Sequence, residues 1–387
     1  MATNFLSALR SGLPGKAGLA SPLLFVRAVL VRDWRFFAMT VVSCSVAATV
    51  ATFQYAVYNS FRSASAVMPR VIAADFWVAA SSVECFDFPS PFSEDFAGVL
   101  ARDLPSASTR RVVFGFVPWN SPSGRRGNVA LVGIEGWQVD GAPLSPLGFV
   151  ANRADLRRLD LTGTARRDAS IGGETLSLEG TVDSLSTYVG APYVIADFET
   201  ARRVLRMEPN SVAFLAGSYG DADPAQFAAA TRAVAASYPD IAMFSRADFA
   251  RSSADYWQNK TGAGLAIGLA ALLAALLMVI LLANGVLRFV QRYYSDLISL
   301  LGHGAARGEI ATIVGAVAVA ITLVSMLGAA IFAPALTLIF KPLLPWVGFS
   351  LSDLTAPLVA AAGALLIALL SARRAIQGFA PDAVFRT

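Results

Sequence analysis

Few residues of this chain carry side chains that could catalyse a reaction or bind a metal ion. The sequence contains one histidine, His303, and two cysteines, Cys44 and Cys85. A hydrolytic triad or a zinc site needs several such groups close together. We therefore expect no catalytic residue and no metal site, and we do not predict an enzyme.

Two further features resemble functional sites, a phosphate-binding loop and a cluster of carboxylates, but we assign no function to either. Residues 12–16 read Gly-Leu-Pro-Gly-Lys, but a phosphate-binding loop needs the spacing G-x-x-x-x-G-K-[ST] after a strand. The chain is therefore expected to bind no cofactor, and any use of ATP would require a partner. Several carboxylates also lie near one another, and we interpret them as surface and helix-capping residues: Asp75, Glu84, Asp87, Glu94 and Asp95.

The most informative segment is a short link between two long apolar runs. Residues 294–310 read Tyr-Ser-Asp-Leu-Ile-Ser-Leu-Leu-Gly-His-Gly-Ala-Ala-Arg-Gly-Glu-Ile. The spacing of the leucines and the isoleucine predicts a short helix with one apolar face, ended by a glycine. Such a face needs a cover, either the bilayer surface or a protein partner. The candidate docking residues are Leu297, Ile298, Leu300, Leu301, Gly302 and His303.

Long apolar runs on both sides of this link indicate a membrane protein. Hydrophobic residues make up 55% of the chain and charged residues 15%, and the mean hydropathy is +0.57. Soluble proteins are about 25% charged, and a helix needs roughly 20 apolar residues to cross a bilayer. We expect four transmembrane helices, at residues 36–58, 259–288, 310–340 and 354–372.

The basic residues between these runs predict the orientation of the chain. Lysine and arginine are retained on the cytoplasmic side of a membrane. They are frequent in the leader 1–35, the link 289–309 and the tail 373–387, whereas the loop 341–353 contains only Lys341. Both termini and the link are therefore expected in the cytoplasm. The basic flanks also explain the net charge of +4, so we infer no nucleic-acid partner.

The leader and the first apolar run allow other interpretations. Ala47, Ala48 and Ala51 resemble the processing site of a signal peptide, but the run begins too late and is too long for one. Within the leader, residues 22–35 mix apolar and basic side chains, which suits an amphipathic helix on the cytoplasmic membrane surface. A frayed basic leader fits these residues equally well.

The insert at residues 59–258 predicts a large extracytoplasmic α/β domain, because short β-rich runs alternate with helical stretches. A helix from Ser245 through Trp257 is expected to continue into the second span, and residues 118–127 are expected to form an exposed loop. Cys85 is its only thiol, so the domain can form no internal disulfide. Strands are expected at 75–80, 111–117, 128–134, 174–180, 193–196 and 212–216, and helices at 91–103, 152–158, 198–205 and 224–238.

The order of the spans, the large insert and two short motifs together resemble the FtsX-like, MacB-like permeases of ABC transport systems, the type VII or mechanotransmission class. The family link reads Glu-x-x-x-Leu-(Lys/Arg)-Ala-(Leu/Met)-Gly. This chain departs from it at Tyr294 and Ser299, which replace an acidic and a basic residue. The matching link residues are Ile298, Leu300, Leu301 and Gly302, and the matching tail residues are Pro381, Val384, Phe385 and Arg386.

Two more segments resemble the branch of the heterocyst-glycolipid exporter permease, the DevC-like branch. They are Asp255-Tyr256-Trp257, just before the second span, and residues 74–78, Ala-Asp-Phe-Trp-Val. The resemblance implies a MacB-like fold, with one span before the outer domain and three after it. It also implies a location in the bacterial inner membrane.

The implied function is that of a permease subunit in an ATP-driven export complex that moves a lipid-like or amphiphilic cargo outward. ATP and magnesium would bind a separate ABC ATPase docked on the link. Other implied partners are a second permease copy, in a homo- or heterodimer, and a periplasmic adaptor of the membrane fusion type. A non-transporting subunit that activates an outer partner such as a cell-wall hydrolase is the alternative. A receptor is the third hypothesis, and the short tail argues against it.

Overall fold

The computed structural model describes residues 27–29, 31–121, 123–139, 141–162, 168–183, 185–188, 190–221 and 224–377. The predicted tail motif at Pro381, Val384, Phe385 and Arg386 lies outside these ranges, as does most of the leader. The described chain divides into a helical unit and a sheet unit. The sheet unit comprises Tyr58–Ala266 and Phe340–Gly348, and the helical unit contains the remainder.

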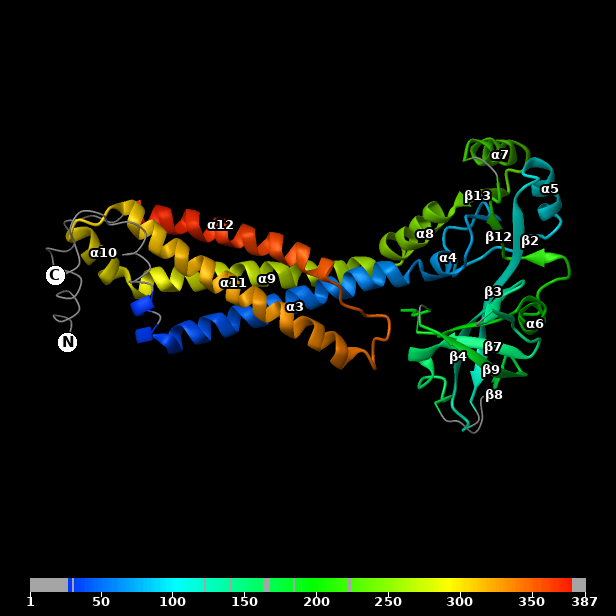
Figure 1. Cartoon of the computed structure of the whole chain (residues 1–387), viewed down its shortest axis with the longest axis horizontal. Coiled ribbons are helices and arrows are strands. Elements are labelled where there is room, and N and C mark those ends of the chain that lie inside the picture. Colours follow the sequence, from blue (N-terminus) through cyan, green and yellow to red (C-terminus); the bar gives the residue numbers. More distant parts are fainter. Residues whose placement is uncertain are drawn as a thin grey trace. The chain divides into compact units, whose positions relative to one another are not determined.

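Four helices are long and apolar enough to cross a membrane. Helix α11 continues through Pro334 to Phe340. Figure 1 shows the four helices side by side in the helical unit. They are α3 (Trp34–Ala64), α9 (Ala263–Arg292), α11 (Arg307–Phe340) and Leu351–Arg374, in which the turn η3 (Leu351–Leu354) leads into α12 (Thr355–Gln377).

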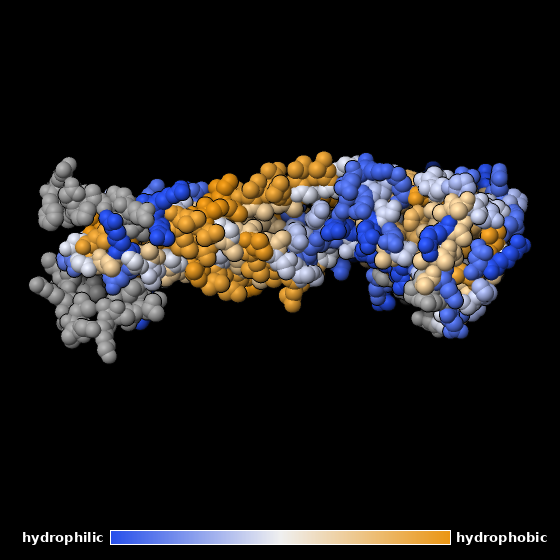
Figure 2. All heavy atoms as spheres, turned by 90° about the horizontal axis from the view of Figure 1, so that it is seen from above, coloured by the Kyte–Doolittle hydropathy of each residue, from blue (hydrophilic) through white to orange (hydrophobic). Residues whose placement is uncertain are grey.

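Small residues bring these helices close together, and large apolar residues cover the outside. A Cβ atom on Gly285 would lie 2.9 Å from Cγ2 of Thr40, and one on Gly328 would lie 3.0 Å from Oγ of Ser45. Close approach of this kind is how helices pack within lipid. Leucines of α9 face outward, and Leu273 among them is 64% exposed. Figure 2 shows a hydrophobic surface over much of the helical unit.

The sheet unit is built on nine strands in the order β13-β1-β12-β3-β4-β10-β7-β9-β8. Strand β3 is 13 residues long and belongs to both halves of the sheet (Figure 1). Its first residues pair with β12, and its last residues, Trp119 and Asn120, pair with β8. The last pairing closes β3, β4, β10, β7, β9 and β8 into a barrel, beside an open sheet of β3, β12, β1 and β13.

The main strands are β1 (Phe76–Ala80), β3 (Ser108–Asn120), β4 (Arg126–Ile134), β7 (Gly148–Asn152), β8 (Asp168–Ile171), β9 (Glu174–Val182), β10 (Tyr193–Asp197), β12 (Phe214–Ser218) and β13 (Ile241–Ser245). The helices and helical turns are α4 (Val67–Val71), α5 (Phe96–Asp103), η1 (Arg153–Asp155), α6 (Phe198–Val204), α7 (Pro224–Ser237), α8 (Arg246–Asp255) and the π-helix η2 (Tyr256–Lys260). Two short pairs, β2 (Phe92–Ser93) with β11 (Ser211–Val212) and β5 (Gln138–Val139) with β6 (Ala142–Pro143), complete the unit.

Each face of the sheet has its own core, because successive strand residues point to opposite faces. On β1, Phe76 and Val78 belong to a core that α5, α6 and α7 cover. Trp77 and Ala79 belong to a second core, on the other face, that α4 and α8 cover. The prediction of a membrane protein with four apolar helices and a large mixed α/β domain is therefore confirmed.

Three local predictions are wrong. The expected helix at 152–158 is only the turn η1, started by the side chain of Asn152, which accepts from the backbone N–H of Ala154. The expected loop at 118–127 is shorter than predicted, because residues 118–120 end β3 and residues 126–127 begin β4. The expected continuous helix into the second span is interrupted at Gly262, whose φ of +73° is incompatible with a right-handed helix.

Candidate functional site

The predicted link helix exists as α10 (Tyr294–Gly302), but its apolar face is not free. Leu297 is fully buried and Ile298 is 6% exposed. Both belong to the helical unit's core, together with Phe289 and Ile310, and the half-buried Leu300 and Leu301 pack against it. The apolar face of α10 that was expected to bind a partner is therefore covered by the chain's own helices. An amphipathic helix buries its apolar face on the nearest apolar surface.

Helix α10 ends at Gly302, as the sequence predicts, but the turn that follows depends on Gly304. Gly302 is the last helical residue, whereas Gly304 has a φ of +95°. The N–H of Ala305 donates to the carbonyl of Leu300, and the N–H of Gly304 donates to that of Leu301, both over 3.0 Å. This pair of bonds is the Schellman motif, which places the left-handed residue at Gly304.

Alanine substitutions distinguish the two glycines. Gly304→Ala should destabilise the protein by about 1–2 kcal/mol, because an L-residue is strained in the left-handed conformation. Gly302→Ala should stabilise it by about 0.5–1 kcal/mol, because alanine suits a helix better than glycine does. The measurement is denaturant unfolding of the two variants in detergent. Equal effects of the two substitutions on the free energy of unfolding would mean that the left-handed conformation of Gly304 does not make the turn.

The accessible face of α10 is polar. Tyr294 is 45% exposed, and Ser295 and Asp296 beside it are also exposed. Gly302 and His303 are exposed at the end of the helix, and the ring Nδ1 of His303 lies 2.7 Å from the carbonyl oxygen of Ser299. A partner in contact with α10 would meet these side chains rather than the leucines.

An ion pair fixes the junction of α9 and α10. The carboxylate of Asp33 accepts from Nε of Arg292 over 3.0 Å and from the hydroxyl of Tyr293 over 2.6 Å. These two hydrogen bonds, that of Arg292 foremost, lower the pKa of Asp33. Asp33 precedes α3, so the start of the first span is tied to the link. The sequence offers no signal for this contact beyond one acidic residue among arginines.

A second cluster lies in the sheet unit, where segments that adjoin three spans meet. Phe61 lies near the end of α3, Trp257 lies in the π-helix before α9, and Trp346 follows α11. The ring centroid of Tyr188 lies 4.7 Å from that of Phe61 and 4.9 Å from that of Trp257. The Phe61 and Trp346 centroids are 6.4 Å apart. We call Phe61, Tyr188, Trp257 and Trp346 the aromatic cluster.

Asp87 lies beside this cluster and is buried, at 4% exposed. Its Oδ1 accepts from the hydroxyl of Tyr193 on β10, and its Oδ2 accepts from Nε1 of Trp257 over 2.8 Å. Burial raises the pKa of Asp87, although both hydrogen bonds oppose that rise. Asp87 is therefore not the surface carboxylate that the sequence predicted.

The residues just before Asp87 attach to the same helical segments. Glu84 pairs with Lys260 of the π-helix, and its carbonyl accepts from the hydroxyl of Ser252 over 2.7 Å. The N–H of Phe86 donates to the hydroxyl of Ser253 over 3.2 Å. Burial raises the pKa of the Cys85 thiol to about 12, so it is a packing residue rather than a nucleophile.

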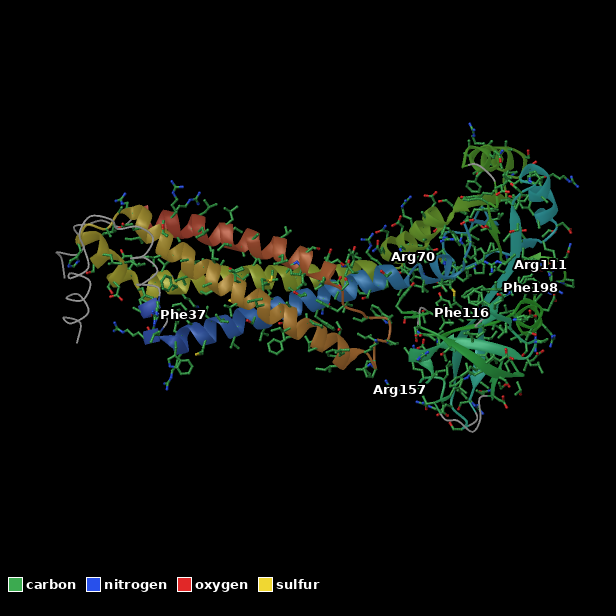
Figure 3. All side chains as sticks on the ribbon, in the orientation of Figure 1. Phe37, Arg70, Arg111, Phe116, Arg157 and Phe198 are labelled. Carbon is green, nitrogen blue, oxygen red and sulfur yellow. The ribbon has the colours of Figure 1, made fainter. Side chains whose placement is uncertain are left out.

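The other carboxylates of the predicted group hold the surface of the sheet unit together. Arg111 pairs with Glu94 over 3.0 Å and with Glu135 over 2.9 Å, and its guanidinium lies 4.5 Å from the ring centroid of Phe198 (Figure 3). Asp75 accepts from the hydroxyl of Ser218 over 2.8 Å. In the part of the chain that the structure describes, no group of three His, Cys, Asp or Glu residues could hold a metal ion.

Comparison with known proteins finds similar solved structures. The periplasmic region of MacB from Actinobacillus actinomycetemcomitans aligns with a TM-score of 0.36 and 9% identity, over 51% of this chain and 99% of that one. The extracellular domain of the noncanonic ABC-type transporter YknZ from Gram-positive bacteria aligns with a TM-score of 0.32 and 11% identity, over 44% of this chain and 98% of that one. No family model and no curated protein matches the sequence.

Proposed function

We propose that this chain is the permease subunit of an ATP-driven ABC export complex. A separate ATPase binds α10 on the cytoplasmic side, and its motion passes through the spans to the sheet unit outside. The sheet unit then moves a lipid-like or amphiphilic cargo outward. Both termini lie in the cytoplasm, and the membrane is the bacterial inner membrane.

The observation that carries this proposal is the pair of elements that flank α9. This helix has 30 residues and is therefore about 45 Å long. It is preceded by the π-helix η2 that contains Trp257, and it is followed by α10, whose Leu297 is fully buried. A push on α10 therefore has a covalent route along α9 to the sheet unit.

The buried face of α10 changes the proposed mode of docking. The leucines of α10 pack it against the spans. The exposed residues around Ser295 and Asp296 make the contact with the ATPase. Tyr294 and Ser299 replace charged residues of the related permeases, so this contact depends less on ion pairs. A second permease copy and a periplasmic adaptor complete the proposed complex.

Replacing Ser295 by tryptophan should abolish copurification of the ATPase, because a bulky ring then stands on the accessible face of α10. The measurement is affinity purification in mild detergent with the ATPase coexpressed. Ser352→Trp, at another exposed serine, serves as the matched control and should retain the ATPase. Retention of the ATPase by Ser295→Trp would move the docking site away from this face.

The alternative, a subunit that activates an outer partner such as a cell-wall hydrolase, would use the same inner contact. The two functions differ in what changes outside the membrane. Cells that lack the chain should retain a lipid or amphiphile if it exports one. They should instead lose the partner's hydrolytic activity if it is an activator.

A further inference from the structure

The Asp255-Tyr256-Trp257 motif lies where the chain passes from α8 to α9, and the helical geometry changes there. The motif ends α8 and begins the π-helix η2, which continues directly from α8, since the N–H of Tyr256 donates to the carbonyls of Ser252 and Ser253. Single π-turns are rare and frequently mark functional sites. Gly262 then interrupts the helical backbone with its positive φ. The regular α-helix is therefore interrupted between α8 and α9, and side-chain contacts add to the backbone connection there.

Asp87 supplies the contact that reaches from this segment into the sheet. Trp257 and Tyr193 both donate to its carboxylate, one from the π-helix and the other from β10. Tyr193 is 3% exposed and Asp87 is 4% exposed, so water has little access to this carboxylate. A buried carboxylate requires such donors, and loss of one leaves an oxygen unpaired.

Neighbouring contacts bind the same two segments and fix the orientation of the indole. The Phe88 ring lies 5.7 Å from the rings of both Tyr256 and Trp257, measured between centroids. A Cβ atom on Gly264 would lie 2.4 Å from Cα of Gln258, so the first turn of α9 packs tightly on the π-helix. Movement of the first turn of α9 would therefore reach the π-helix that contains Trp257.

We infer that Asp87 is the positioning residue that couples α9 to the sheet, because its carboxylate holds the indole of Trp257 and the hydroxyl of Tyr193 together. This inference rests on the proposed function, since it supplies the outer half of the transmission route. When the ATPase drives α9, the Asp87 carboxylate transfers the displacement of the π-helix to β10.

The test uses the full chain copurified with its ATPase and reconstituted in lipid nanodiscs. Hydrogen–deuterium exchange is measured with and without ATP for residues 256–260 and for 193–197. In the wild type, ATP should change the exchange of both segments. In Trp257→Phe, which keeps the ring but loses the N–H, the response of 193–197 should fall at least tenfold while that of 256–260 persists.

Two variants make the result specific to the hydrogen bond. Trp119→Phe is the matched control, because the buried indole N–H of Trp119 has no hydrogen-bond partner among the residues that the structure describes. It should respond like the wild type. Asp87→Asn should also retain the response, because its amide oxygen can accept from Trp257 while its amide N–H donates to the hydroxyl oxygen of Tyr193. Asp87→Leu should lose it.

The outcomes separate this inference from the function on which it rests. An unchanged response of 193–197 in Trp257→Phe, with the ATPase bound and active, would overturn the inference alone. Equal losses in Trp119→Phe and Trp257→Phe would also overturn it. Failure of any ATPase to copurify with the wild type would overturn the proposed function, and the inference with it.

Discussion

Leu297→Asp should prevent the helical unit from forming a stable bundle. Leu297 is fully buried in the core that joins α10 to the spans. Loss of a buried leucine side chain costs about 2–5 kcal/mol, and an unpaired buried carboxylate adds several kcal/mol. Their sum approaches the total stability of a typical protein, about 5–15 kcal/mol. The measurement is the yield of monodisperse protein after extraction, followed by denaturant unfolding.

The matched control places the same new residue on the other face of the same helix. Ser295 is exposed, so Ser295→Asp should change the free energy of unfolding by less than about 0.5 kcal/mol. If Leu297→Asp folded as well as Ser295→Asp, the apolar face of α10 would not be packed on the spans. That result would instead favour a partner protein bound to the apolar face of α10.

Trp77→Ala should produce a comparable loss in the sheet unit. Trp77 is fully buried on β1, and its ring centroid lies 5.8 Å from that of Phe86, 5.9 Å from that of Phe214 and 5.4 Å from that of Phe249. Removing a buried aromatic side chain costs about 3–5 kcal/mol, because a large cavity remains. The measurement is the midpoint of denaturant unfolding, followed by tryptophan fluorescence and circular dichroism.

Tyr238→Ala provides the comparison for an aromatic residue that is less enclosed. Tyr238 is 40% exposed, although its ring lies 5.2 Å from that of Phe96 between centroids. Its removal should cost much less than the removal of Trp77. Equal losses would mean that the core on the α4 and α8 face does not hold the sheet together.

Hydropathy and strand periodicity predict most of the architecture. Each span is an apolar run with polar ends, and β1, β3 and β4 carry the β-branched and aromatic residues typical of strands. Strand β7 is missed because all five of its residues are buried, so it has no alternation, and its sequence Gly-Phe-Val-Ala-Asn has weak strand propensity. A helix is expected over the residues that follow it, 152–158, but only the turn η1 forms.

The functional contacts depend on which distant segments meet, and a single sequence does not contain that information. The pattern of α10 predicts an apolar face, but Phe289 and Ile310 decide that the chain itself covers it. Asp87 appears among several ordinary carboxylates, and only the fold brings Tyr193 and Trp257 to it. Conversely, the Asp-Tyr-Trp motif is visible in the sequence, and its contact with Asp87 gives it a physical role.

The most direct test of the central claim is purification of the wild-type chain from its native membrane in mild detergent, with mass spectrometry of everything bound. We expect an ABC ATPase in stoichiometric amount, together with a cargo lipid or amphiphile. A pure, folded chain that repeatedly carries no ATPase would contradict the account.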